Sequence, residues 1–260
     1  MKNFEKGIMK DKSTRLFYIL GAFFLANAIL AEFIGVKLFS LEKTLGFNSI
    51  NVSMFGIENL SFNLTAGVLL WPVVFIMTDI INEYFGRKGV RFLSFTAAGL
   101  ILYAFLMVYF AILLTPADFW IERSTSNGVV NMDIAFTAIF GQGLWIIVGS
   151  LVAFLIGQLV DVTVFHFVKA KTGNRKIWLR ATGSTLVSQF IDSFVVLFIA
   201  FYIGAGWDLK LVLAIGMMNY AYKFFIAVTL TPVLYIIHFL VDLYLGKETA
   251  HKLMEEAAKA

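Results

Sequence analysis

The 260-residue sequence contains no cysteine, and only 15% of its residues are charged. The absence of cysteine excludes a small secreted fold that is held together by disulfides. The scarcity of charge says more, because a soluble domain is about a quarter charged and about half apolar, whereas this chain is 60% hydrophobic. Such a chain has too little polar surface to coat a water-soluble particle and too many apolar residues for disorder. The sequence therefore predicts an integral membrane protein.

Motifs of soluble enzymes are missing as well. The sequence has no G-x-S-x-G turn, no H-E-x-x-H motif, no Walker loop and no cysteine–histidine metal cluster. We therefore expect no catalytic residues, no metal site, no cofactor and no use of ATP by the chain itself. An intramembrane enzyme built on Asp79 and Asp192 is a weaker hypothesis, since no motif places these two carboxylates together.

Six apolar windows are long enough to cross a membrane as helices, which takes about 20 residues each. They are residues 16–38, 62–81, 92–114, 135–168, 181–203 and 211–243. The expected fold class is all-α, a polytopic bundle of six transmembrane helices. We expect the domains to be a cytoplasmic basic N-terminus (1–15), the transmembrane domain (16–246) and a cytoplasmic C-terminal tail (247–260). The connections 39–61 and 115–134 are expected on the outer side, as a lid or as short interfacial helices.

Lysine and arginine are concentrated in alternate connections between these windows. The N-terminal segment, the second and fourth connections and the tail hold 16 of the 21 basic residues. By the positive-inside tendency, both termini face the cytoplasm of a multi-pass protein. The net charge of +4 thus reports orientation in the membrane, and we expect lipid and no nucleic acid as a partner.

Ionisable side chains inside the windows are candidates for function, because a charge at the bilayer centre costs about 3 kcal/mol on insertion scales. Asp79 and Glu83 are four residues apart, on one face of the predicted second helix. Both are candidates for proton coupling. The alternative is an interfacial charge cluster with Arg87 and Lys88.

Three further charged residues lie deep in their windows. Asp192 and Lys223 are expected to pair, either at a substrate site or as a purely structural buried ion pair. Glu32 is either a functional carboxylate or a side chain that extends to the outer interface. Asp161 is expected near the inner interface, away from the site.

Trp71 directly precedes Pro72 inside the second window. Proline removes a backbone hydrogen bond within a helix. We expect it to kink this helix, and the alternative is a broken helix beside a binding site, as in many transporters.

Residues 63–86, 188–194, 219–224 and Thr231–Pro232 carry a family resemblance. They are similar to the queuosine precursor transporters, small bacterial inner-membrane proteins, and the stretch from Thr78 to Gly86 is the most diagnostic part. The similarity covers residues 17–246. It implies import by alternating access of 7-deazaguanine bases such as 7-cyano-7-deazaguanine, which feed tRNA modification.

The resemblance also gives the polar residues of the windows a ligand. A deazaguanine has a flat ring, which stacks on aromatic faces, and two neighbouring N–H donors, which one carboxylate can accept. The predicted substrate-binding residues are Asn27, Glu32, Trp71, Asp79, Trp145, Gln189, Asp192, Asn219, Tyr222 and Lys223.

Two alternatives concern partners. The chain is either a self-sufficient transporter or the substrate-binding subunit of an energy-coupling-factor importer, for which Ala22 and Ala26 offer a small-xxx-small face to a scaffold helix. The glycines near Gly141 and Gly149 are compatible with a homodimer, and equally with close packing inside one chain.

Overall fold

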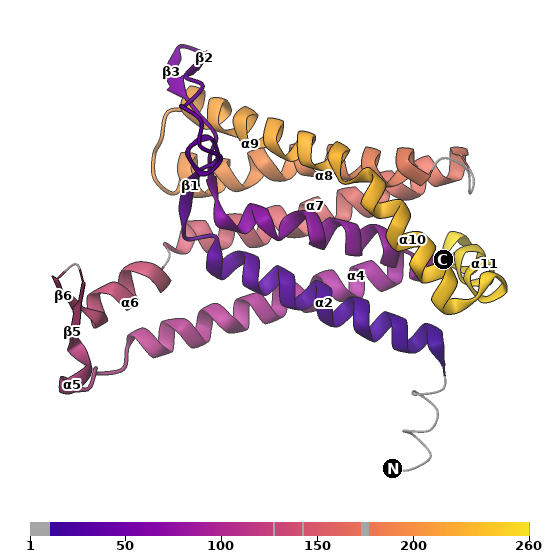
Figure 1. Ribbon diagram of the computed structural model, residues 1–260, viewed down its shortest axis with the longest axis horizontal. Helices are drawn as coiled ribbons and strands as arrows, with labels where there is room; N and C mark the ends of the chain where they lie inside the picture. Colours follow the sequence, from indigo (N-terminus) through magenta and orange to yellow (C-terminus); the bar gives the residue numbers. More distant parts are fainter. Residues whose placement is uncertain (1–10, 127, 142, 173–176, 260) are drawn as a thin grey trace.

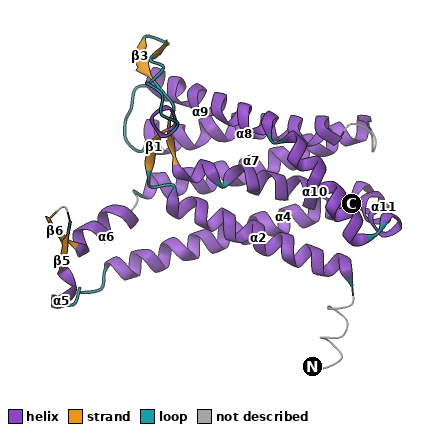
Figure 2. Ribbon diagram, viewed as in Figure 1, coloured by secondary structure: helices purple, strands orange, loops and turns teal. Residues whose placement is uncertain are grey.

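The computed structural model describes residues 11–126, 128–141, 143–172 and 177–259 (Figure 1). Long helices run alongside one another through the molecule, and short strands lie only at one end of them (Figure 2). Residues 1–10 of the predicted basic N-terminus are outside the described residues.

The longer helices are α2 (Lys12–Ile34), α4 (Trp71–Ile112), α7 (Leu144–Thr172), α8 (Ile177–Leu197) and α9 (Leu209–Thr229). The shorter helices are α3 (Leu41–Thr44), α5 (Asp118–Ile121), α6 (Met132–Phe140), α10 (Thr231–Leu245) and α11 (Lys247–Lys259), with a 3-10 turn η1 (Ala66–Leu69) and a π-helical segment η2 (Phe198–Ile203). Three antiparallel strand pairs are β1 (Leu38–Ser40) with β4 (Asn63–Thr65), β2 (Val52–Met54) with β3 (Ile57–Leu60), and β5 (Glu122–Thr125) with β6 (Gly128–Asn131).

Five helical stretches of the described chain are long and apolar enough to cross a membrane. They are Lys12–Ile34, Trp71–Ile112, Met132–Thr172, Trp178–Ile203 and Leu209–Thr229, and α10 is a shorter apolar helix. The predicted class, a mainly helical polytopic membrane protein, is confirmed at this level.

Helix α4 reverses direction in its middle, at Gly86. This residue has φ 68° and ψ −172°, which no helix contains, and the chain turns back there (Figure 1). Thr78 and Ser94, on either side of the turn, both donate a hydrogen bond to Gln158 Oε1, at 3.2 and 3.4 Å. In a straight helix these two residues would lie about 24 Å apart. The two arms of α4, residues 71–85 and 87–112, therefore lie alongside one another.

Several predicted helix boundaries are wrong. The window 62–81 starts with strand β4 and η1, and α4 begins only at Trp71 with Pro72 in its first turn. Proline is favoured at this position because the first helical N–H groups have no partner in the helix. The expected kink at Pro72 is therefore absent, and Pro72 marks the start of the helix.

The window 135–168 is likewise divided. Its first part is the separate helix α6, which ends at Phe140, and α7 begins at Leu144. The connections 39–61 and 115–134, which are expected on the outer side, contain strands as well as short helices. The buried side chain of Glu42 fixes the first of these connections, since Glu42 Oε1 accepts the Phe62 N–H at 2.8 Å.

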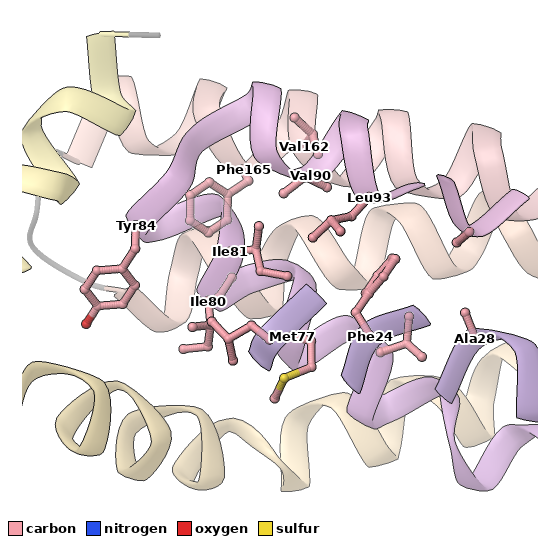
Figure 3. Close-up of a cluster of buried hydrophobic side chains, with 14 of the residues drawn as sticks. Phe24, Ala28, Met77, Ile80, Ile81, Tyr84, Val90, Leu93, Val162 and Phe165 are labelled. Carbon is pink, nitrogen blue, oxygen red and sulfur yellow. The ribbon is translucent and has the colours of Figure 1, made fainter. Parts of the chain in front are cut away.

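One hydrophobic core joins α2, both arms of α4 and α7. Figure 3 shows Phe24 of α2, Met77 and Leu93 of the two arms and Phe165 of α7 within this cluster. These side chains are at most 8% exposed. Helices α8 and α9 pack on the other side of α7 in turn, α7 against α8 and α8 against α9.

The Gly86 turn, the start of α2 and the C-terminal helix lie at the same end of the molecule (Figure 1). Lys12 Nζ donates a hydrogen bond to Tyr244 O at 3.0 Å. A Cβ at Gly86 would lie 3.0 Å from Ala257 O of α11. The predicted tail 247–260 is therefore a helix packed on α4 for most of its length.

Candidate functional site

A cavity of about 30 Å³ lies between the first arm of α4, helix α8, the end of α9 and the start of α10. Its walls are Pro72, Phe75, Ile76, Asp79, Thr182, Thr185, Gln189, Ile226, Ala227, Leu230, Thr231 and Leu234. The polar lining residues are Asp79 of α4, the three residues of α8 and Thr231 of α10, and the other lining residues are apolar. This volume is enough for a water molecule and far below the roughly 300 Å³ at which ligand pockets begin.

Asp79 and Gln189 give the cavity two free hydrogen-bond acceptors. Asp79 is 6% exposed and Gln189 4% exposed. No hydrogen-bond partner for Asp79 Oδ1 or Gln189 Oε1 exists among the described residues. Because buried polar atoms are nearly always hydrogen-bonded, each such exception requires an explanation. A water molecule, for which the cavity has room, or a ligand with N–H donors would supply the missing partners.

Asp161 lies behind the cavity, on α7, and is fully buried. Thr185 Oγ1 is 3.5 Å from Asp79 Oδ2 and also 3.5 Å from Asp161 Oδ1. Ser188 Oγ donates to the same Asp161 oxygen at 3.3 Å. Asp161 Oδ2 has no hydrogen-bond partner in the described chain. Two carboxyl groups and two hydroxyl groups thus form a connected buried cluster.

Glu83 lies one turn from Asp79 and is surrounded by cations. Arg180 donates Nε to Glu83 Oε2 at 2.9 Å and Nη2 to Oε1 at 2.8 Å. Lys169 Nζ is 3.2 Å from Glu83 Oε1. All three side chains are at most 5% exposed. Glu83 is therefore in a charge cluster, but its partners come from α7 and α8 and are not the Arg87 and Lys88 named in the sequence-based alternative.

The predicted pair of Asp192 and Lys223 is present. Lys223 Nζ lies 2.5 Å from Asp192 Oδ2 and joins α8 to α9. Both side chains are only partly buried. Asp192 is three residues beyond Gln189, so the pair lies close to the cavity without lining it.

Glu32 lies on α2, where its Oε2 accepts a hydrogen bond from Ser150 of α7 at 2.8 Å. Asn27 donates to the backbone oxygen of Phe23, one turn earlier on the same helix, at 2.8 Å. Neither residue is among the described residues that line the cavity.

The predicted aromatic residues are dispersed. The ring of Trp71 packs against Phe154 with centroids 5.7 Å apart, and Trp145 is 47% exposed near the start of α7. Tyr222 and Asn219 are half-buried on α9. The part of the chain that the structure describes thus brings two of the ten predicted binding residues, Asp79 and Gln189, to the cavity wall.

The sequence-based selection missed residues that the fold brings to this place. Thr182, Thr185 and Gln189 follow the spacing i, i+3 and i+7 and therefore share one face of α8. That spacing could have identified the two threonines. Helical spacing could not have identified Asp161 and Arg180 as part of this region, because their partners are on other helices.

The cavity is too small for a flat ring in this structure, but the groups in its wall are of the kinds that bind a ring with several N–H donors. Asp79 supplies carboxylate oxygens, Gln189 and the threonines supply amide and hydroxyl groups, and Phe75 supplies a ring. Within the described residues, no group of three His, Cys, Asp or Glu side chains could hold a metal ion.

Residues 65–237 match the protein family described as "Putative vitamin uptake transporter". The chain is 28% identical to the probable queuosine precursor transporter of Bacillus subtilis strain 168, over 69% of this chain and 73% of that protein. It is 26% identical to the probable queuosine precursor transporter of Haemophilus influenzae Rd, over 86% of both chains.

A third relative is the queuosine precursor transporter of Escherichia coli K12, 26% identical over 65% of this chain and 70% of that protein. No solved structure matches the chain significantly. The family match covers most of the chain, including all of the cavity wall. The chain therefore belongs to the vitamin uptake transporter family, as its resemblance to the queuosine precursor transporters predicts.

Proposed function

We propose that this multi-pass membrane transporter imports 7-deazaguanine bases such as 7-cyano-7-deazaguanine, and that Asp79 binds them in the cavity between α4 and α8. Family membership supports a transporter of a small molecule. The names of three relatives support queuosine precursors as that molecule.

The two unpartnered acceptors in the cavity wall are the observation that carries this proposal. The guanine-type edge of the base has a ring N–H and an exocyclic NH₂ side by side. Asp79 can accept both with its two carboxylate oxygens, and a bidentate charge-assisted contact is about twice as strong as a neutral one. Gln189 lies within the same wall and has an amide that can pair with a further polar atom of the ring.

Phe75 is the ring best placed to stack on the base. It is 6% exposed and lines the cavity one turn from Asp79. The predicted stacking residue Trp71 packs on Phe154 of α7 instead. We therefore assign stacking to Phe75 in this conformation.

The small cavity volume supports transport by alternating access. A base does not fit into about 30 Å³, so the walls must separate to admit it. Such a movement would break contacts that join α8 to α9 and α10. They are the hydrogen bond between Thr182 and Thr231, at 2.9 Å, and the ion pair between Lys223 and Asp192.

We further infer six membrane crossings with both termini in the cytoplasm of a bacterial inner-membrane protein. The reversal at Gly86 divides the 42-residue α4, whose straight length of about 63 Å would be twice the hydrocarbon thickness. Residues 71–85 extend for about 22 Å, and η1 adds about 8 Å before them. Together they match the roughly 30 Å of a bilayer core.

The test uses a bacterial strain that cannot make queuosine precursors and lacks its own importer. Expression of this chain should restore queuosine in tRNA at low external 7-cyano-7-deazaguanine. The variant Asp79→Asn, expressed at the same level, should not restore it. Unmodified tRNA in cells that hold the wild-type protein in their membrane would contradict the substrate assignment.

The second candidate function is the substrate-binding subunit of an energy-coupling-factor importer, and one observation supports it. Ala22 and Ala26, the small residues on α2, both face outward from the bundle. They could contact a scaffold helix in the membrane. Uptake by this chain in cells that lack any coupling module would eliminate this candidate.

A further inference from the structure

The buried cluster of Asp79, Thr185 and Asp161 carries an inference about energy coupling, which rests on the proposed function. Asp79 Oδ2 and Asp161 Oδ1 are each 3.5 Å from the same atom, Thr185 Oγ1. The two carboxylate oxygens are therefore no more than about 7 Å apart. Asp79 is 6% exposed and Asp161 is fully buried.

A threonine hydroxyl has one hydrogen to donate. Thr185 can donate it to Asp79 or to Asp161, and its lone pairs then face the other carboxyl group. That second contact is favourable only if the carboxyl group has a hydrogen of its own. One acidic proton within the pair makes both contacts of Thr185 favourable.

The charges around Asp79 and Asp161 also favour one proton shared by the pair. Glu83 lies one turn from Asp79 on α4, and it is the partner of both Arg180 of α8 and Lys169 of α7. These two cations are thus already engaged by a carboxylate other than Asp79 or Asp161. His166 of α7 is a further titratable group on this side, with Arg87 nearby, and its Nε2 lies 3.0 Å from Asn82 Oδ1. Two ionised carboxylates would repel each other in this buried site, and Arg180, the cation near Asp79, is hydrogen-bonded to Glu83 through Nε and Nη2.

We propose that Asp79 and Asp161 share one proton through Thr185, and that this proton is the ion whose inward movement drives uptake of the base. Asp161 holds the proton while Asp79, as the carboxylate, accepts the two N–H donors of the substrate. The closed site then contains proton and substrate together, which is the requirement for symport. After both are released on the inner side, the empty protein returns to its outward-facing state and takes up the next proton there.

The experiment uses the full-length protein in proteoliposomes, with labelled 7-cyano-7-deazaguanine and the membrane potential clamped by potassium and valinomycin. With acid outside, the wild type should accumulate the base, up to about tenfold for each unit of pH difference. A sodium gradient at equal pH should give no accumulation. Accumulation driven by sodium alone would overturn the proton assignment.

Asp161→Asn removes the proton carrier and leaves the cavity wall intact. This variant should lose accumulation driven by the pH gradient, yet still exchange labelled for unlabelled base across the membrane. Asp118→Asn, an exposed carboxylate on α5, is the matched control and should accumulate the base as the wild type does. Wild-type accumulation by Asp161→Asn would overturn the inference.

Two further variants apply if Asp161→Asn fails to fold. Thr185→Val removes the bridging hydroxyl and should lower pH-driven accumulation relative to exchange, whereas Thr185→Ser keeps the hydroxyl and should restore it. An equal ratio of pH-driven accumulation to exchange in Thr185→Val and Thr185→Ser would overturn the inference. A wild-type protein that does not exchange the base at all would instead contradict the proposed function.

Discussion

Asp79 and Glu83 lie one helical turn apart on α4, yet their surroundings are opposite. Glu83 accepts hydrogen bonds from Arg180 with both carboxylate oxygens and is also paired with Lys169. Asp79 has one oxygen without any hydrogen-bond partner among the described residues, and it lines the cavity. A carboxylate whose two oxygens are both hydrogen-bonded to other helices holds those helices together. A carboxylate with an oxygen that has no such partner is available to a ligand. This difference supports a structural role for Glu83 and the proposed binding role for Asp79.

Glu83→Gln should destabilise the protein severely. The substitution leaves Arg180 and Lys169 buried without a counterion, and breaking a buried ion pair in this way costs about 3–5 kcal/mol. Thermal unfolding in detergent measures the loss. Glu256→Gln removes the partner of Lys252 in an exposed pair on α11 and should cost less than about 1 kcal/mol. Equal stability of the two variants would contradict the structural role of Glu83.

Asp79→Asn should weaken binding of the base without a comparable loss of stability. The amide replaces one acceptor oxygen by an NH₂ group, which then faces the N–H donors of the ligand. Loss of a charged hydrogen bond costs about 1.5–3 kcal/mol, or roughly a 10- to 100-fold higher Kd. Isothermal titration of the purified protein with 7-cyano-7-deazaguanine gives this value. An unchanged Kd would remove Asp79 from the site.

At the scale of elements, the reversal of α4 depends on one residue. The positive φ of Gly86 is a conformation that residues with a Cβ rarely adopt. An added Cβ would also lie 3.0–3.2 Å from the backbone of Ala257 on α11. Gly86→Ala should therefore lower stability by about 1–3 kcal/mol.

Gly99 of the same helix offers a matched control for that prediction. A Cβ at Gly99 would meet nothing within 4 Å. Gly99→Ala should be neutral, or stabilising by about 0.5–1 kcal/mol because alanine favours the helix. Both changes are measured as shifts of the unfolding midpoint in detergent. A Gly86→Ala variant as stable as Gly99→Ala would contradict the packing of α11 on the turn.

The helices and strands show how much of the fold can be predicted from a single sequence. Apolar windows predicted the membrane helices because burial in lipid demands about 20 apolar residues wherever the chain crosses. They failed where mostly apolar residues do not continue one helix. Residues 62–70 and 135–140 are mostly apolar, but the first stretch forms strand and 3-10 turn and the second forms the separate helix α6. Hydropathy records burial in lipid and does not record where the backbone leaves the helical path.

The site was less predictable than the fold. Depth in the membrane singled out Asp79 and Gln189, which both line the cavity, since burial of polar groups in a bilayer is costly. The pairing of helix faces was not readable from the sequence. Asp161 of α7 therefore looked interfacial, although α8 brings Thr185 within 3.5 Å of it. Such contacts depend on how each helix is rotated about its own axis. The positions of polar residues along a helix do not determine that rotation.

For the whole molecule, the absence of cysteine makes the orientation directly testable. Ser124→Cys places a thiol on the exposed β5 strand, and Lys252→Cys places one on the exposed face of α11 at the opposite end (Figure 1). A membrane-impermeant maleimide should label only the first in intact cells, and both after permeabilisation. Labelling of Lys252→Cys alone in intact cells would invert the proposed topology.

The reversal at Gly86 also has a consequence for biosynthesis. The arm 71–85 contains Asp79 and Glu83, each costing about 3 kcal/mol on insertion scales, so it is a poor membrane segment by itself. Residues 92–112 of the second arm contain no charged side chain. Because no loop separates the arms, they can leave the translocon together as a helical hairpin, in which the apolar arm carries the charged one. The substrate-binding carboxylate would then enter the bilayer only after Ile112 has been synthesised.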